Sequence, residues 1–203
     1  MLTKLKQKVQ QVLTFEAKAA HKLGLTPNMI TAIGLAFAFL SAFAYAEWQF
    51  HLIVPWLAFI LLLLSGFCDA LDGIVARIYG ESTVFGGFLD SLLDRYADAA
   101  VFVGIIIVGL CYYWAGLLAI IGSLLVSYSR ARAEAAGFKM ESVGLAERAE
   151  RMLILLLATL IAIYWLPALN IGVIIIAALA NVTVVQRAAY VYVKTKKKES
   201  VKT

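Results

Sequence analysis

Long apolar segments are the feature of this sequence that most constrains its fold. A helix needs roughly 20 apolar residues to cross the hydrocarbon core of a bilayer, and six segments approach or exceed that length, at about 28–48, 52–79, 84–112, 114–136, 145–165 and 168–193. Hydrophobic residues make up 63% of the 203-residue chain, and its mean hydropathy is +0.87. A soluble globular fold is therefore excluded, and the sequence predicts an all-α integral membrane protein with six transmembrane helices.

The residues ahead of the first apolar segment have an amphipathic pattern. In residues 1–25, leucine and valine side chains recur at helical spacing on one face, while most of the lysines gather on the opposite face. This pattern predicts an N-terminal amphipathic helix that lies along the membrane surface. The alternative is a soluble helix packed on the protein's own cytoplasmic face. The expected organisation is an amphipathic helix over 1–25, a six-helix domain over 26–193 and a basic tail over 194–203.

The 18 lysines and arginines predict the orientation of the chain in the membrane. With six spans, all of them fall toward one face, and the connections near 49–51, 113 and 166 carry none. Because cytoplasmic loops are enriched in basic residues, both termini of this multi-pass cell-membrane protein are expected in the cytoplasm. The formal net charge of +5 is explained by affinity for anionic lipid headgroups, so no nucleic-acid partner is expected.

Four aspartates stand where the second and third apolar segments approach the cytoplasmic face. Asp69 and Asp72 are three residues apart, and Asp90 and Asp94 are four apart, so each pair shares one helix face. The connection between the pairs is short, so the two helices are antiparallel and can bring all four carboxylates together. The converging charges would repel one another unless cations lay among them, which predicts a hard divalent cation, Mg²⁺ or Mn²⁺. Ion pairs with the two nearby arginines are the alternative, but they leave negative charge over.

These aspartates are part of a longer pattern. The residues from Asp69 to Asp94 read D-x2-D-G-x2-A-R-x8-G-x3-D-x3-D, which resembles the full signature of the CDP-alcohol phosphotransferases with no departure. The resemblance implies a membrane enzyme, commonly a homodimer, that displaces CMP from a CDP-linked lipid with an alcohol. Because the aspartates lie toward the face that carries the basic residues, the active site is expected on the cytoplasmic side.

The same resemblance implies roles for the individual acids. Asp69, Asp72 and Asp90 would be metal ligands. Asp94 would be a further metal ligand and the catalytic general base that takes the proton of the acceptor hydroxyl. In the alternative, all four acids only bind metal and the proton leaves through water.

The resemblance also implies a binding site for the CDP portion of the lipid. Its predicted residues are Asn28, Thr31, Asp69, Gly73, Arg77 and Gly86. The two at the start of the first span have a simpler explanation as well. "TPNMIT" is a plain helix start, with Thr26 as N-cap and Pro27 at the first helical position.

Arginines gather at the cytoplasmic ends of the last three segments. The pattern S-Y-x-[KR]-A-R-A-E followed by G-x2-E-R-x2-R resembles the branch of the family that uses inositol phosphate, making phosphatidylinositol phosphate or its archaeal ether-lipid counterpart. Guanidinium groups suit bidentate phosphate binding. The predicted ligands of the acceptor phosphate are Arg130, Arg132, Arg148, Arg151 and Arg187. Ordinary positive charge on the cytoplasmic face is the alternative.

Two other functions stay open on the sequence alone. Glycerol phosphate would serve as an acceptor of the same charge. A divalent-cation transporter, from a different class of protein, also carries intramembrane acids. Such a transporter needs its acids near the midplane or on both sides, whereas the four aspartates cluster toward one face. The expected partners are therefore a CDP-linked lipid, inositol phosphate, membrane lipids and a second copy of the chain.

Overall fold

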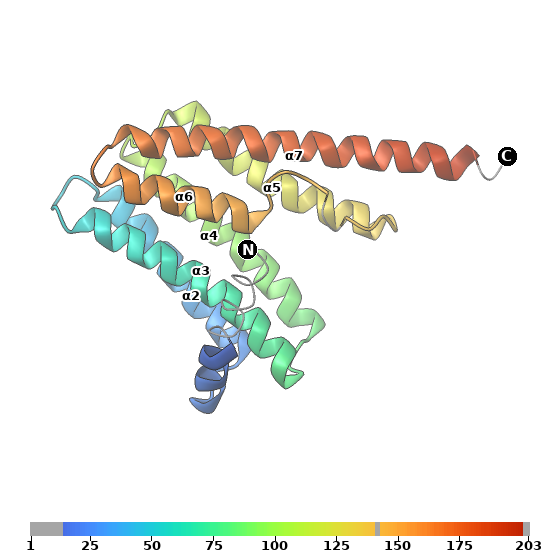
Figure 1. Ribbon diagram of the computed structural model, residues 1–203, viewed down its shortest axis with the longest axis horizontal. Helices are drawn as coiled ribbons and strands as arrows, with labels where there is room; N and C mark the ends of the chain where they lie inside the picture. Colours follow the sequence, from blue (N-terminus) through green and yellow to red (C-terminus); the bar gives the residue numbers. More distant parts are fainter. Residues whose placement is uncertain (1–13, 141–142, 201–203) are drawn as a thin grey trace, which may run out of the picture. The chain divides into compact units, whose positions relative to one another are not determined.

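The computed structural model describes residues 14–140 and 143–200, with side chains as far as residue 197. Helices make up most of these ranges (Figure 1). A short helix over 14–22 comes first. The longer helices follow in this order: α2 (Pro27–Ala46), α3 (Val54–Tyr79), α4 (Val84–Ile107), α5 (Tyr113–Ala135), α6 (Arg148–Ala162) and α7 (Pro167–Ser200). No strand occurs within the described ranges, which confirms the predicted all-α class.

Each of the six apolar segments coincides with one of the helices α2 to α7, and four of these are long and apolar enough to cross a membrane: α2, α3, α5, and α7 as far as Lys197. Helix α4 differs because four charged side chains lie within its 24 residues. Helix α6 differs because it has only 15 residues. The structure thus confirms a multi-pass helical chain. By length and composition, four of its described helices are candidate spans, whereas the sequence predicts six.

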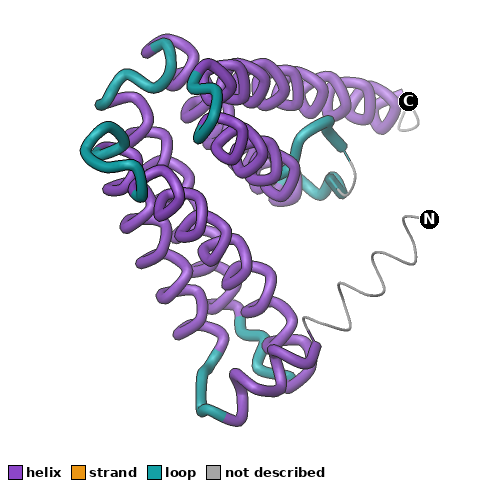
Figure 2. Tube along the Cα trace, turned by 60° about the vertical axis from the view of Figure 1, so that its left-hand side comes forward, coloured by secondary structure: helices purple, strands orange, loops and turns teal. Residues whose placement is uncertain are grey.

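The described chain forms two compact units, Met1–Val101 and Phe102–Thr203, and α4 crosses the boundary between them. In the first unit, α2 and α3 pack along each other. In the second unit, α7 packs against both α5 and α6. Figure 2 traces the same helices and the loops that join them.

Small residues allow α2 and α3 to approach closely. Gly34, Ala38 and Ser41 recur at a spacing of three to four residues and are all buried in α2. A Cβ atom added to Gly34 would lie only 2.9 Å from the Cβ of Cys68 on α3. The Ser41 hydroxyl donates a hydrogen bond of 2.9 Å to the carbonyl oxygen of Ala58. This is how membrane helices associate, because lipid tails supply little hydrophobic drive and close packing must replace it.

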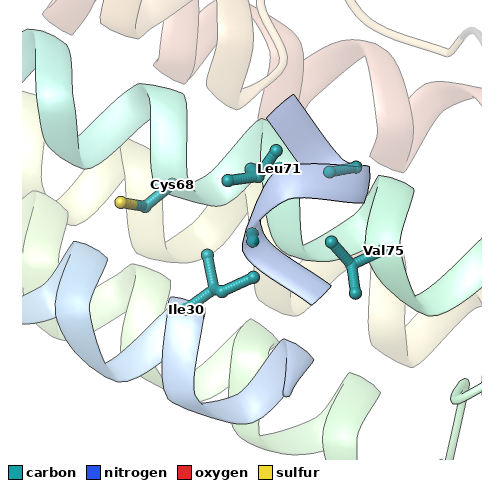
Figure 3. Packing of buried hydrophobic residues seen from close by; sticks show 6 residues of the cluster. Ile30, Cys68, Leu71 and Val75 are labelled. Atoms are coloured by element: carbon teal, nitrogen blue, oxygen red, sulfur yellow. The ribbon is translucent and has the colours of Figure 1, made fainter. Parts of the chain in front are cut away.

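The helix over 14–22 packs on the first unit through two alanines. Ala17 and Ala20 are buried in a cluster with Ile30 of α2 and with Cys68, Leu71 and Val75 of α3 (Figure 3). Over these residues, the helix matches the alternative of a segment packed on the protein itself. Most of the predicted surface helix falls on residues 1–13, which lie outside the described residues.

The second unit uses the same kind of close contact. A Cβ atom on Gly172 of α7 would lie 2.4 Å from the Cβ of Ala158 on α6. On the other side of α7, the Asn181 amide donates to the carbonyl oxygen of Leu118 on α5 at 3.1 Å. Helix α7 is therefore fixed against both of its neighbours.

The contact at Gly34 predicts the effect of one added methyl group. Gly34→Ala forces the α2 and α3 backbones apart, and overpacking of this kind costs about 1–3 kcal/mol. Gly87→Ala is the matched control, since a Cβ there meets no atom within 4 Å and alanine raises helix propensity by up to about 1 kcal/mol. Thermal unfolding in one detergent, followed by tryptophan fluorescence, should show a lower Tm for Gly34→Ala and an equal or higher Tm for Gly87→Ala. An unchanged Tm for Gly34→Ala would contradict the close packing of α2 on α3.

Candidate active site

A four-residue connection turns the chain from α3 into α4. Helix α3 ends at Tyr79 and is capped by Gly80, whose φ of 66° lies in the left-handed region and whose N–H donates to the carbonyl oxygen of Ala76. At the start of α4, the Thr83 hydroxyl oxygen accepts a hydrogen bond of 2.9 Å from the N–H of Gly86. Both helix ends are thus capped locally. The capped turn places the first residues of α4 beside the last turns of α3.

The turn brings three of the four predicted aspartates together. Carboxylate oxygens of Asp69, Asp90 and Asp94 all lie within 4.8 Å of one another. The Asp94 side chain is only 14% exposed, and its Oδ2 lies 3.4 Å from Nη1 of Arg95. Hard carboxylate oxygens at this separation suit Mg²⁺ or Mn²⁺. The donor set therefore fits the predicted divalent cation.

Asp72 has a different environment from the other three. Its side chain is buried, and its Oδ2 accepts a hydrogen bond of 2.7 Å from the hydroxyl of Thr31 on α2. It lies outside the group of converging carboxylate oxygens but lines the adjoining cavity together with Asp90. Asp72 therefore joins α2 to the acidic end of the site.

A cavity of about 140 Å³ lies between the start of α2, the end of α3 and the start of α4. Its walls combine glycine and alanine with hydroxyl, amide and carboxylate groups. The lining residues are Pro27, Asn28, Thr31, Asp72, Gly73, Ala76, Glu81, Ser82, Thr83, Gly86, Gly87 and Asp90. A cavity with polar groups and little side-chain bulk suits a polar ligand that approaches the backbone closely.

Four of the six residues predicted to bind the CDP portion line this cavity: Asn28, Thr31, Gly73 and Gly86. A Cβ atom on Gly86 would lie 3.1 Å from the Asn28 side-chain oxygen, so glycine keeps this wall open. The fifth, Asp69, belongs to the acidic cluster. The sixth, Arg77, extends its guanidinium along Gly73, where an added Cβ would lie 3.6 Å from Nη1.

The start of α2 also follows the simpler interpretation. Helix α2 begins at Pro27, and the Thr26 side chain accepts from the N–H of Met29 as an N-cap. The first turn of α2 therefore both begins the helix and forms part of the cavity wall.

Sequence reasoning assigned no role to Glu81, Ser82 and Thr83, which the structure places in the cavity wall. The sequence feature that could have indicated them is the eight-residue gap between Arg77 and Gly86 in the signature. A connection of fixed length between two site residues has to pass close to the site.

The predicted phosphate-binding arginines all lie in the second unit, and Arg187 is the most buried of them. Its side chain is 1% exposed. Its Nε donates to the carbonyl oxygen of Val143 at 2.9 Å, and its Nη1 donates to that of Val126. Nη2 lies 3.5 Å from Oε1 of Glu147. Arg187 therefore fastens the connection between α5 and α6 to helices α5 and α7.

Two more side chains fix the same connection. The Thr183 hydroxyl oxygen accepts hydrogen bonds of 3.2 Å from the N–H groups of Leu145 and Ala146. Arg151, also buried, donates from Nη1 to the carbonyl oxygen of Ala146 at 3.2 Å. Gly144 has a φ of 129°, and a Cβ there would lie 2.4 Å from Cγ2 of Thr183, so only glycine fits.

The remaining predicted arginines are more accessible. Arg130 is 44% exposed, with Nε 3.0 Å from Glu134 and Nη1 3.9 Å from Glu147. Arg132 is exposed, and Arg148 is partly buried. Arg130 and Arg187 thus share Glu147 as a partner, whereas no contact in the described part of the chain places Arg132 in this group.

Comparison with known proteins identifies the family. The CDP-alcohol phosphatidyltransferase family model matches residues 24–186. An archaetidylinositol phosphate synthase from Pyrococcus horikoshii is 43% identical over 187 residues, which cover 92% of this chain and 94% of that protein. A phosphatidylinositol phosphate synthase from Mycolicibacterium smegmatis is 33% identical, over 84% of this chain and 79% of that protein.

Solved structures agree with the sequence matches. The phosphatidylinositol phosphate synthase of Mycobacterium tuberculosis in complex with manganese and citrate is 30% identical, with a TM-score of 0.77 over 89% of this chain and 88% of that chain. The same enzyme with CDP-DAG bound gives a TM-score of 0.71 over 90% of this chain and 94% of that chain. The sequence signature, the helical fold and the acidic cluster agree, and this chain belongs to the CDP-alcohol phosphatidyltransferase family.

Proposed function

We propose that this chain transfers the phosphatidyl or archaetidyl group of a CDP-linked lipid to a hydroxyl of inositol phosphate and releases CMP. The observation that carries the proposal is the convergence of Asp69, Asp90 and Asp94 at the edge of a cavity with small-residue walls. The names of the relatives support it, since they are archaetidylinositol phosphate and phosphatidylinositol phosphate synthases. These names do not favour glycerol phosphate, and the family match does not favour a cation transporter.

Four aspartates are proposed to hold the metal. Asp69, Asp90 and Asp94 offer converging oxygens, and Asp72 borders the same space. A divalent cation bound there would neutralise the diphosphate oxygens and stabilise the CMP leaving group. The manganese in the similar solved structure supports this assignment.

Asp94 is proposed as the general base. In the reaction, the acceptor oxygen forms a bond to the lipid-bearing phosphorus, while the bond from that phosphorus to the CMP oxygen breaks and its electron pair leaves with CMP. The acceptor proton goes to the Asp94 carboxylate. The small exposed fraction of Asp94 favours this role, because a largely buried carboxylate meets few competing water molecules. The alternative remains that the proton leaves through water.

The cavity beside the acids is proposed to bind the CDP portion. Asn28 and Thr31 supply an amide and a hydroxyl from α2, and Gly73 and Gly86 leave room for the ligand. Arg77 supplies a positive charge next to Gly73. Asp69 contributes from the acidic cluster. The CDP-DAG in the similar solved structure supports a nucleotide ligand of this kind.

The arginines of the second unit are proposed to bind the acceptor phosphate. Arg130 and Arg132 are exposed and offer donors directly, whereas Arg148 is partly buried. Arg151 and Arg187 are buried, and each already holds the connection between α5 and α6, so they add positive charge and shape. A guanidinium that donates to neutral carbonyl oxygens keeps its full charge, which still attracts an anion.

The membrane arrangement follows from the same elements. We infer six spans, because each of the helices α2 to α7 coincides with one of the six apolar segments and because six spans bring all the basic residues toward one face. Six spans place both termini and the active site on the cytoplasmic side. A surface helix over 1–25, a catalytic domain over 26–193, a basic tail over 194–203 and a homodimer complete the proposal.

The first prediction concerns the metal. Asp69→Asn and Asp90→Asn should each lower CMP release from a CDP-linked lipid by about a hundredfold or more, because each removes an anionic ligand. Glu47→Gln, an exposed change at the C-terminal end of α2, is the control and should keep full activity. A chelator should abolish CMP release by the wild type, and added Mg²⁺ or Mn²⁺ should restore this activity. Full activity in the presence of chelator would overturn the metal-dependent mechanism.

The second prediction separates the base from the metal ligands. General bases contribute about 10²–10⁴ to the rate, so Asp94→Asn should lose transfer by that factor and still bind CDP-lipid. Single-turnover CMP release and equilibrium CDP-lipid binding, measured on the same preparation, give the two values. A loss of binding equal to the loss of rate would assign Asp94 to metal binding alone.

The third prediction concerns the acceptor. Hydrogen bonds to charged groups contribute about 1.5–3 kcal/mol. Arg132→Ala and Arg148→Ala should therefore lower kcat/KM for inositol phosphate by about tenfold to a hundredfold, with little change in KM for the CDP-lipid. Lys194→Ala removes an exposed charge from the distant end of α7 and serves as the control. Unchanged kinetics in both arginine variants, or a preference for glycerol phosphate, would refute the inositol phosphate assignment.

A further inference from the structure

A histidine on the N-terminal helix reaches the wall of the cavity. His21 Nε2 lies 3.2 Å from Oε1 of Glu81, which is one of the lining residues. The His21 ring also stacks on Tyr79, with ring centroids 3.5 Å apart and planes 8° from parallel. Two separate contacts therefore tie the helix over 14–22 to the end of α3 and to the connection that follows it.

The position of His21 is itself fixed. Ala17, one turn earlier on the same helix, is fully buried, and Ala20 beside His21 is nearly so. Both pack against Ile30 of α2 and against residues of α3 (Figure 3). Helix packing therefore fixes the backbone at His21, and stacking on Tyr79 fixes the imidazole ring. It can in turn hold the Glu81 carboxylate in one orientation.

Glu81 is an unexpected group to find beside a diphosphate. Its carboxylate is not among the converging oxygens of the metal cluster, and it would repel the phosphates. Glu81 directly follows Gly80. Gly80 is eight residues beyond Asp72, a distance of about 12 Å along the helix axis at 1.5 Å per residue. Glu81 therefore stands away from the acidic end of the cavity, in the same connection as the neutral Ser82 and Thr83.

The chemistry of a carboxylate decides what it binds there. An ionised carboxylate only accepts hydrogen bonds. The nucleoside half of a CDP-linked lipid offers two kinds of donor, the exocyclic amine of cytosine and the hydroxyls of the ribose. Acidic side chains accept from both kinds of group in other proteins.

We propose that Glu81 recognises the nucleoside half of the CDP-linked lipid by accepting a hydrogen bond from it, and that His21 is the positioning residue that holds Glu81 for this contact. The inference rests on the proposed function, because it takes the cavity as the CDP site. It adds a specificity-determining pair that lies outside the signature positions.

The test measures nucleotide binding to the purified full-length protein in detergent with Mg²⁺. The probes are CMP, UMP (which lacks the amine), 2′-deoxy-CMP (which lacks one ribose hydroxyl) and pyrophosphate (which lacks the nucleoside). Glu81→Gln and Glu81→Ala should weaken CMP binding by about tenfold to a hundredfold and leave pyrophosphate binding unchanged. They should also reduce one preference: CMP over UMP if the donor is the amine, or CMP over 2′-deoxy-CMP if it is the ribose. Glu47→Gln is the matched control.

Two variants of His21 separate its contacts. His21→Phe keeps a ring on Tyr79 and removes the donor to Glu81, whereas His21→Gln keeps a donor and removes the stacked ring. We expect His21→Phe to lose the same nucleotide preference as Glu81→Gln while keeping the wild-type Tm and pyrophosphate affinity. His21→Gln should keep most of the preference.

The outcomes distinguish this inference from the proposed function. If the wild type binds CMP and both Glu81 variants keep all four affinities, the recognition role is wrong and the proposed function stands. If His21→Phe weakens CMP and pyrophosphate equally, His21 is a structural residue and the positioning role is wrong. If the wild type neither binds CMP nor releases it from a CDP-lipid, the proposed function fails and this inference fails with it.

Discussion

The crowding of carboxylates at the end of two apolar helices is the constraint on which the first unit depends. Oxygens of Asp69, Asp90 and Asp94 lie within 4.8 Å of one another, and like charges this close repel strongly in a medium of low dielectric constant. The short, capped turn over 80–83 brings α4 back near enough to form the cluster. The cost of that arrangement is offset when a cation binds, so this part of the fold and the metal site are specified together.

Helices α2 and α3 are held together by small and polar side chains as well as by buried apolar ones. Gly34 and Ser41 let α2 lie close along α3, and Thr31 donates to the buried Asp72 across the same interface. Each of these contacts satisfies a polar group or removes bulk where the backbones approach. The exposed leucine, isoleucine and phenylalanine side chains of both helices are then left for lipid.

The sequence predicted the helices and half of the residues that line the cavity, because both depend on local patterns. Apolar length located α2 to α7, and the fixed spacing of the signature located Gly73, Gly86 and the converging acids. Contacts between distant segments were not predictable in this way. Arg187 donates to Val126 and Val143, 61 and 44 positions away, and His21 reaches Glu81 across 60. No periodicity in the sequence encodes such partners. The sequence therefore predicts Arg187 only as a phosphate ligand and Glu81 only as part of a turn.

The two units balance their buried charges in different ways, and the difference bears on what each one binds. In the first unit, carboxylates face carboxylates, so the excess charge is negative and calls for cations. In the second unit, Arg151 and Arg187 donate to backbone carbonyl oxygens, which satisfy hydrogen bonds without cancelling charge. Glu147 is shared between Arg130 and Arg187 and neutralises one charge at most. Among these side chains, arginines outnumber glutamates. A connection that carries several arginines suits an anionic acceptor, because the charge of the anion complements theirs.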